Sequence, residues 1–132
     1  MYNFALQKIP EIVGKFSFYK LIVDGKCEFD RFESEIQKDG NLRRELIKLQ
    51  ARMQEVADGS RLPDTKFKDL TPKGETVKEY ELKTDHLRLY FIEEAVEKRL
   101  IICGGKKSTQ DKDIKHFQKV KKEYLIQKNY VK

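Results

Sequence analysis

The sequence predicts an α+β fold in which helices pack on one antiparallel sheet. Residues 77–103 contain two short segments in which apolar and polar residues alternate, followed by a nearly continuous apolar run at 99–103, and both patterns are typical of strands. Residues 28–58 instead carry apolar residues at helical spacing, and a further amphipathic segment covers 109–127. The expected order is β-α-α-β-β-β-α, a four-stranded antiparallel sheet packed by a helical hairpin and a C-terminal helix.

The N-terminal part of the chain is expected to supply the first strand. Residues 1–16 stay unassigned, because Pro10 and Gly14 limit any helix there to a short piece. Residues 18–23 read as a strand, which ends at the turn-forming pair Asp24-Gly25.

Two helices are expected next, at 28–38 and 41–58. The first ends at Asp39-Gly40, and Asn41 can cap the second. The apolar seam of the second helix recurs at steps of four, three, four and three residues. It consists of Leu42, Leu46, Leu49, Met53 and Val56. Because this seam lasts only about two heptads, it predicts an intramolecular core rather than a coiled coil.

A polar connection at 60–76 separates the helical hairpin from three strands, expected at 77–84, 87–93 and 98–103. Gly104-Gly105 is expected to break the last strand, and Ser108 or Thr109 can cap the final helix. One face of that helix is apolar and carries Ile114, Phe117, Val120, Tyr124 and Leu125.

Length and composition bound the class of protein. The 132 residues are expected to form a single domain, 1–132, and no apolar run approaches the length of a membrane span. The N-terminus lacks the features of a secretory signal, so a cytoplasmic location is expected. Cys27 and Cys103 are expected to be free thiols, and no Cys/His spacing suggests a metal, so neither a metal nor another cofactor is expected.

The positive charge lies in the second half of the chain. Residues 1–60 hold 10 basic and 10 acidic groups, whereas residues 61–132 hold 18 and 12, which accounts for the whole net charge of +6. Such clustering is typical of a phosphate-binding surface, although a solvated, lysine-rich helix face gives the same composition.

Arg88 is the first candidate for chemistry. It shares a strand face with Tyr90, opposite an apolar stripe, and can either present its planar guanidinium to a phosphate or pair with Glu79 or Glu81 across the hairpin. Glu81 could act as a base towards a ribose 2′-hydroxyl, but a glutamate on a strand usually pairs with a neighbouring cation.

The two ends of the Arg88 hairpin supply the other candidates. Lys106 and Lys107 follow two glycines that let a ligand approach the backbone, or they belong to an ordinary exposed loop. Lys83 and His86 lie at the turn. A histidine can act as a general acid or base near neutral pH, but a single turn histidine is more often only exposed.

At these residues the chain resembles the RelE/HigB-type toxins of bacterial toxin–antitoxin pairs. The residues that carry the resemblance are YELKTDHLRLYF at 80–91, followed by GGKKSTQDKDI at 104–114. The toxins have a Tyr-Glu-Leu-Arg/Lys strand, a Leu/Tyr-Arg strand, a hydrophobic strand, and Lys-Lys-x-Thr-Gln before the final helix. The resemblance extends over residues 17–127.

The resemblance implies a metal-independent endoribonuclease that cleaves messenger RNA at the ribosome and is silenced by a cognate antitoxin protein. It makes Arg88 the group that stabilises the scissile phosphate, and the other catalytic candidates are Lys107, His86 and Glu81. The expected RNA-binding residues are Lys66, Lys68, Lys83, Lys106 and Lys112.

The chain departs from the best-known RelE pattern, which has basic residues where this chain has Glu79 and Glu81. The departure resembles the HigB-like branch, and it leaves the general acid and base unassigned. The alternatives are a ParE-like toxin that inhibits DNA gyrase and a non-catalytic domain that binds nucleic acid or a partner protein.

Overall fold

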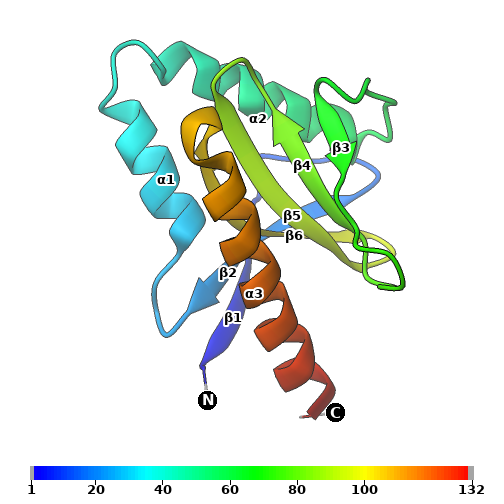
Figure 1. Ribbon diagram of the computed structural model, residues 1–132. Helices are drawn as coiled ribbons and strands as arrows, with labels where there is room; N and C mark the ends of the chain where they lie inside the picture. The colour runs from blue at the N-terminus through cyan, green and yellow to red at the C-terminus, as the bar shows by residue number, and fades with distance from the viewer. Residues whose placement is uncertain (1, 131–132) are drawn as a thin grey trace.

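Six strands form one mixed sheet, in the order β1-β2-β6-β5-β4-β3, in the computed structural model, which describes residues 2–130 (Figure 1). The strands are β1 (Phe4–Lys8), β2 (Ser17–Val23), β3 (Phe67–Asp69), β4 (Glu79–Lys83), β5 (Leu87–Ala95) and β6 (Lys98–Lys106). The helices are α1 (Glu28–Gln37), α2 (Arg43–Ala57) and α3 (Gln110–Tyr130), with a 3₁₀ turn, η1 (Lys107–Thr109), before α3.

The predicted sheet of four antiparallel strands is therefore wrong, although the α+β class is compatible with the structure. Two strands were missed, and β2 pairs with β6 in parallel, with Tyr19 opposite Leu100. The other neighbouring strands pair antiparallel. The parallel pair joins segments about eighty residues apart in the chain, and no local turn signal encodes such a pairing.

The two missed strands lie at the two edges of the sheet. β1 falls within the unassigned N-terminal residues, where Phe4 and Leu6 are half-buried and alternate with the exposed Ala5 and Gln7. β3 lies within the predicted polar connection, where the Phe67 ring stacks on Phe91 with ring centroids 5.9 Å apart. Pro10 obscured the first strand, and the charged neighbours of Phe67 obscured the second.

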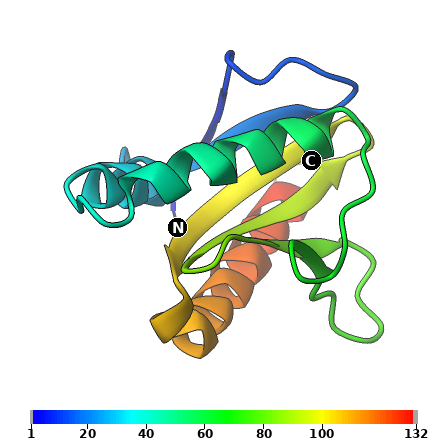
Figure 2. The ribbon, with the colours of Figure 1, turned by 90° about the horizontal axis from the view of Figure 1, so that it is seen from above.

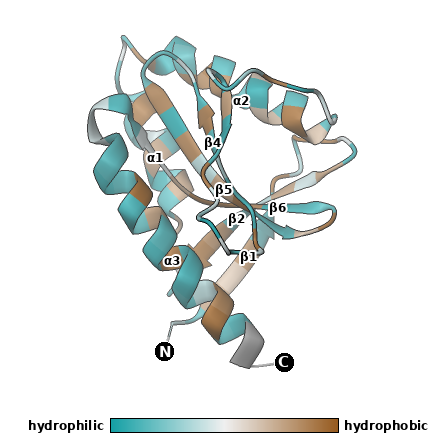
Figure 3. Cartoon of the chain, turned by 45° about the vertical axis from the view of Figure 1, so that its right-hand side comes forward, coloured by the Kyte–Doolittle hydropathy of each residue, from teal (hydrophilic) through white to brown (hydrophobic). Residues whose placement is uncertain are grey.

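Helices cover both faces of the sheet (Figures 1 and 2). On one face, α1 and α2 pack through Phe29, Phe32, Leu46 and Leu49 against Leu89, Phe91 and other strand residues. On the other face, α3 packs through Phe117 and Tyr124 against Tyr90, Ile92 and Leu100. Hydrophobic residues are concentrated in the central strands, while the outer sides of α1 and α3 are largely hydrophilic (Figure 3). The seam of α2 is thus an intramolecular core, as predicted.

The helix ends differ slightly from the prediction. Asn41 does not cap α2, which begins at Arg43 after Leu42. The backbone N–H of Asn41 instead donates to the Asp39 side chain (3.0 Å), so these residues form a turn between the two helices. The turn at Asp24 and Gly25 is present, and both residues have positive φ angles, 50° and 79°.

Gly104 and Gly105 do not break β6, which continues to Lys106 through their pairs with Leu89 and Arg88. They are required for close packing. A Cβ on Gly104 would lie 2.6 Å from the Phe32 ring of α1, and one on Gly105 would lie 2.0 Å from the Asp113 carboxylate of α3. Both faces of β6 are thus covered at the same point.

None of the helices between residues 2 and 130 combines the length and the apolar character needed to cross a membrane. Both cysteines are free thiols, with Cys103 buried in β6 and Cys27 half-buried before α1. Burial raises the pKa of the Cys103 thiol well above its usual value, which keeps it protonated and unreactive.

Replacing Gly104 with alanine should lower the free energy of unfolding by roughly 1–3 kcal/mol, because the added methyl group overlaps the Phe32 ring and α1 must shift. Gly40→Ala is the matched control, since a Cβ at Gly40 meets nothing within 4 Å. Urea denaturation of both variants measures the difference. Equal losses in the two variants would contradict the packing role of Gly104.

Candidate functional site

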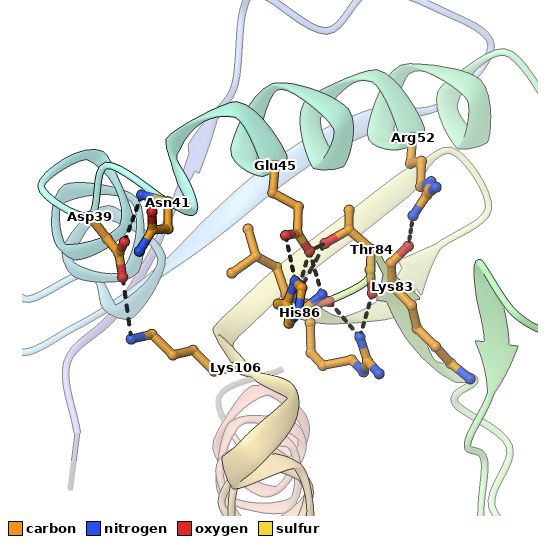
Figure 4. Close-up of polar contacts among 10 residues, drawn as sticks. Asp39, Asn41, Glu45, Arg52, Lys83, Thr84, His86 and Lys106 are labelled. Carbon is orange, nitrogen blue, oxygen red and sulfur yellow. Dashed lines mark hydrogen bonds and ion pairs between the residues drawn. The ribbon is translucent and has the colours of Figure 1, made fainter.

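The turn between β4 and β5 is held by a buried carboxylate from α2. Glu45 accepts hydrogen bonds from the Thr84 hydroxyl and the His86 backbone N–H, and a third from the Leu87 backbone N–H at 3.2 Å. Figure 4 shows Glu45 reaching from α2 into this turn. The N–H groups of the turn therefore have a charged acceptor that fixes their positions.

The same carboxylate orients the His86 imidazole. His86 Nδ1 lies 3.0 Å from Glu45 Oε2, and the histidine side chain is 67% exposed. Because the carboxylate only accepts hydrogen bonds, Nδ1 must carry the proton, and Nε2 is left free to exchange a proton with a ligand. The arrangement is that of a histidine held in one tautomer by an acidic partner.

Glu45 stays ionised at neutral pH. Burial acts to raise its pKa, but the hydrogen bonds from the Thr84 hydroxyl and from the backbone and ring of His86 outweigh burial, so the pKa lies below its usual value. The dyad is thus an anionic carboxylate paired with an imidazole.

Arg88 supports the same turn from the other face of the sheet. It is buried, and its Nη1 donates to the carbonyl oxygens of Thr84 (2.7 Å) and Leu87 (2.8 Å). Glu45 thus binds N–H groups of the turn while Arg88 binds its C=O groups. Two opposite charges, on two different faces, hold one four-residue turn.

Glu81 is fully buried between the sheet and α3, together with Arg88. Its Oε2 accepts from the Gln110 side chain at 2.8 Å and lies 4.0 Å from Arg88 Nε. The Lys83 ammonium lies 3.9 Å from its Oε1. This geometry matches the cross-hairpin pairing that was one of the two alternatives for Arg88.

Three buried atoms beside this pair have no hydrogen-bond partner within the described part of the chain: Glu81 Oε1, Arg88 Nε and the Tyr90 hydroxyl oxygen. Burial, followed by the charge of Glu81, raises the pKa of the Tyr90 hydroxyl far above its usual value, so it stays protonated. Polar atoms left unpaired in the interior cost stability. The unpaired buried polar atoms of the described chain are therefore concentrated where α3 packs on the sheet around Glu81 and Arg88.

The predicted lysines lie in four places. Lys66, Lys68 and Lys83 lie together at the β3–β4 edge, where Lys68 is opposite Glu81 and the Lys83 N–H donates to the Lys66 carbonyl (2.8 Å). The Lys107 backbone lies next to the His86 backbone, because its N–H donates to the His86 carbonyl oxygen (2.8 Å).

Lys106 and Lys112 each lie apart from the other lysines. Lys106 occupies the strand position opposite Leu87, whose face is that of α1 and α2, and its ammonium lies 3.9 Å from Asp39 (Figure 4). Lys112 lines a separate cavity of about 540 Å³ together with Lys26 and Arg31. The structure therefore brings His86, Lys107, Lys83 and Lys66 to one end of the sheet but does not bring Lys106 and Arg88 to one face.

The arrangement provides an oriented imidazole at the end of the sheet where Lys83 ends β4 and Lys107 follows β6, which suits proton transfer next to an anionic substrate. No group of three or more His, Cys, Asp or Glu side chains suited to a metal ion occurs among residues 2–130. Glu45 was missed in the sequence. Its only signal was a carboxylate one helical turn before Leu49, on the edge of the apolar seam.

Searches against protein-family models, curated proteins and solved structures give no match for this chain. The resemblance to the RelE/HigB-type toxins accordingly remains a prediction from the sequence.

Replacing Glu45 with glutamine should lower the free energy of unfolding at pH 7 by roughly 2–4 kcal/mol, because buried donors lose their charged acceptor. The folded-state pKa of Glu45 lies below the unfolded value of 4.5, so its contribution is present above that pH and is lost as the pH falls through the folded value. The difference between wild type and variant should therefore shrink below about pH 4.5. Glu55→Gln, at an exposed position of α2, is the control. Urea denaturation at pH 7 and at pH 3 measures the difference in unfolding free energy between wild type and each variant.

Proposed function

We propose that this chain is the toxin of a toxin–antitoxin pair and acts as a metal-independent endoribonuclease on messenger RNA at the ribosome. The observation that carries the proposal is the Glu45–His86 pair beside the Lys107 backbone, at the end of the sheet where Lys66 and Lys83 also lie. The resemblance of residues 17–127 to RelE/HigB-type toxins supports the same activity.

In the proposed reaction the ribose 2′-hydroxyl attacks the adjacent phosphorus. His86 Nε2 takes the hydroxyl proton, and Glu45 stabilises the imidazolium that forms. The bond from phosphorus to the 5′-oxygen then breaks, and His86 returns the proton to that oxygen. The products are a 2′,3′-cyclic phosphate and a 5′-hydroxyl end.

Lysines offset the charge that develops on the phosphorane. Lys83 is the last residue of β4 and Lys107 the first after β6, so both are close to the turn, and Lys66 and Lys68 extend the positive surface along the β3 edge for the flanking phosphates. Lys106, whose ammonium lies near Asp39, and Lys112, which lines a separate cavity, are assigned to more distant phosphates.

Arg88 and Glu81 act indirectly in this proposal. Arg88 binds the carbonyl oxygens on both sides of His86 from the interior, and Glu81 lies beneath it. They are positioning residues for the turn. Their burial implies that Arg88→Ala disturbs the fold as well as the reaction.

The proposed partner that silences the toxin is a net-acidic antitoxin protein. The net charge of +6, concentrated after residue 60, favours association with an acidic polypeptide.

Replacing His86 with glutamine should lower messenger RNA cleavage by on the order of a hundredfold or more, because the proton-transfer group is lost. Stability should change little, since the side chain is mostly exposed. The chain offers a matched control in His116, its only other histidine, whose Nε2 contacts Glu28 at 2.9 Å on a different surface. His116→Gln should cleave RNA normally.

Both variants are expressed in a bacterium to score growth arrest, and the purified proteins are assayed on messenger RNA with ribosomes. Equal activity of wild type and His86→Gln would refute the role of the dyad. Growth arrest with intact RNA and inhibited gyrase would replace the nuclease with the ParE-like activity.

Replacing Lys66 and Lys68 together with alanine should weaken RNA binding and make it less dependent on salt. Each lost phosphate contact should reduce the slope of log K against log salt by about 0.7 for single-stranded RNA. Lys38→Ala with Lys48→Ala, both exposed on the α1–α2 side, should leave the slope unchanged. Fluorescence anisotropy of a labelled RNA across a salt series tests this, and identical slopes in both double variants would exclude the β3 edge from RNA binding.

A further inference from the structure

The outer edge of β1 is an unpaired strand edge. β1 hydrogen-bonds to β2 on one side, and no other strand among residues 2–130 lies on its other side. Figure 1 shows β1 at the margin of the sheet.

The hydrogen bonds at the ends of this hairpin show which groups point outward. The Asn3 carbonyl accepts from Asp24 N–H and the Ile9 N–H donates to the Phe18 carbonyl, both at 2.9 Å. Groups that face a neighbour alternate along an antiparallel strand, so the odd-numbered residues of β1 bond to β2. The N–H and C=O groups of the even-numbered residues point away from the sheet. They belong to Phe4, Leu6 and Lys8, and none of them forms a backbone hydrogen bond to another segment between residues 2 and 130.

The two edges of the sheet differ in their protection. β3, at the opposite edge, has three residues, and two of them are the charged Lys68 and Asp69. β1 has five residues, with Lys8 as its one charged side chain. Short strands and charges are the usual means of preventing strand addition, so β1 is the edge that remains open to it.

A cavity of about 700 Å³ lies next to this edge, on the face covered by α1 and α2. Gln7 and Ile9 line it from the β1 side, Phe29 and Met53 from the buried core, and Ile47 from α2. Ile47 is 65% exposed, which is unusual for a large apolar side chain. The lining also includes charged side chains of both signs, Lys8, Glu11, Lys20 and Glu33, so the cavity offers apolar side chains with a charged rim within reach of a strand added to β1.

We propose that the β1 edge binds an extended segment of another polypeptide, which joins the sheet as a seventh strand. Main-chain hydrogen bonds to Phe4, Leu6 and Lys8 would provide affinity, and an apolar side chain entering the cavity beside Ile47 would provide selectivity. This inference is independent of the proposed nuclease activity.

Charge identifies the kind of segment. A second copy of this chain would bring together two molecules of net charge +6, which opposes association. Lys8 has no ion-pair partner within the described residues and lies at the end of the edge, where it favours an acidic residue on the added strand. The partner is therefore an extended segment with an acidic residue opposite Lys8 and at least one apolar side chain.

A phage-displayed library of random eight-residue peptides, panned against the wild-type chain, supplies the probe. Enriched peptides are synthesised, and their Kd values are measured for the wild type, Leu6→Pro and Leu6→Ala. Proline removes the outward N–H of Leu6 and leaves the bonds to β2 intact, whereas alanine removes the side chain and keeps that N–H. Binding should fall at least tenfold with Leu6→Pro and less than threefold with Leu6→Ala.

A second measurement keeps the test valid if Leu6→Pro does not fold. Peptides that are N-methylated at the positions facing β1 should lose at least tenfold in affinity for the wild-type chain, while methylation at the alternate positions should have little effect. The proposal would be overturned if no peptide is enriched, or if neither Leu6→Pro nor N-methylation of the peptide lowers the affinity. A dimer in sedimentation whose Phe4, Leu6 and Lys8 amides are protected from hydrogen exchange would also overturn it, because a second copy would then occupy the edge.

Discussion

The turn from Thr84 to Leu87 is held between two buried charges of opposite sign, and the candidate site depends on that arrangement. Glu45 reaches the turn from α2 and binds its N–H groups, while Arg88 binds its C=O groups from the face covered by α3. Each charge is stabilised by several hydrogen bonds, and removal of either would leave backbone groups unpaired in the interior. The position of His86 is therefore coupled to the packing of helices on both faces.

The glycines of β6 bring the final helix to this turn. Because neither Gly104 nor Gly105 has a side chain, β6 passes between Phe32 of α1 and Asp113 of α3 without breaking. The strand then ends at Lys106, and the Lys107 N–H meets the His86 carbonyl. The same close packing that removes side chains from two positions thus brings the Lys107 backbone to the His86 backbone.

Much of the fold could be predicted from the sequence, because most elements are encoded by local patterns. The seam of α2, the strands β4 to β6 and the final helix all follow from periodicity. The parallel pairing of β2 with β6 could not be predicted, since it depends on contacts between distant segments. The proximity of His86 to Lys107 follows from the pairing of neighbouring strands, whereas Glu45 lies 41 residues from His86 and its only local signal was its place on the edge of the α2 seam. The burial of Arg88 was also hidden, because its partners are backbone carbonyls that every residue carries.

The two proposed binding surfaces lie at opposite sides of the sheet. Three strand intervals separate β1 from β5, and at about 4.8 Å each this places the two strands roughly 14 Å apart. A segment added to β1 would therefore extend the sheet away from His86 and leave the turn open to RNA. Inhibition by such a partner would require a second segment that crosses the sheet. Since the bonds of the turn are made to α2 and to the interior rather than to β2, strand addition alone would leave the dyad in place. A partner that silences the chain from this edge must therefore also cover the turn itself.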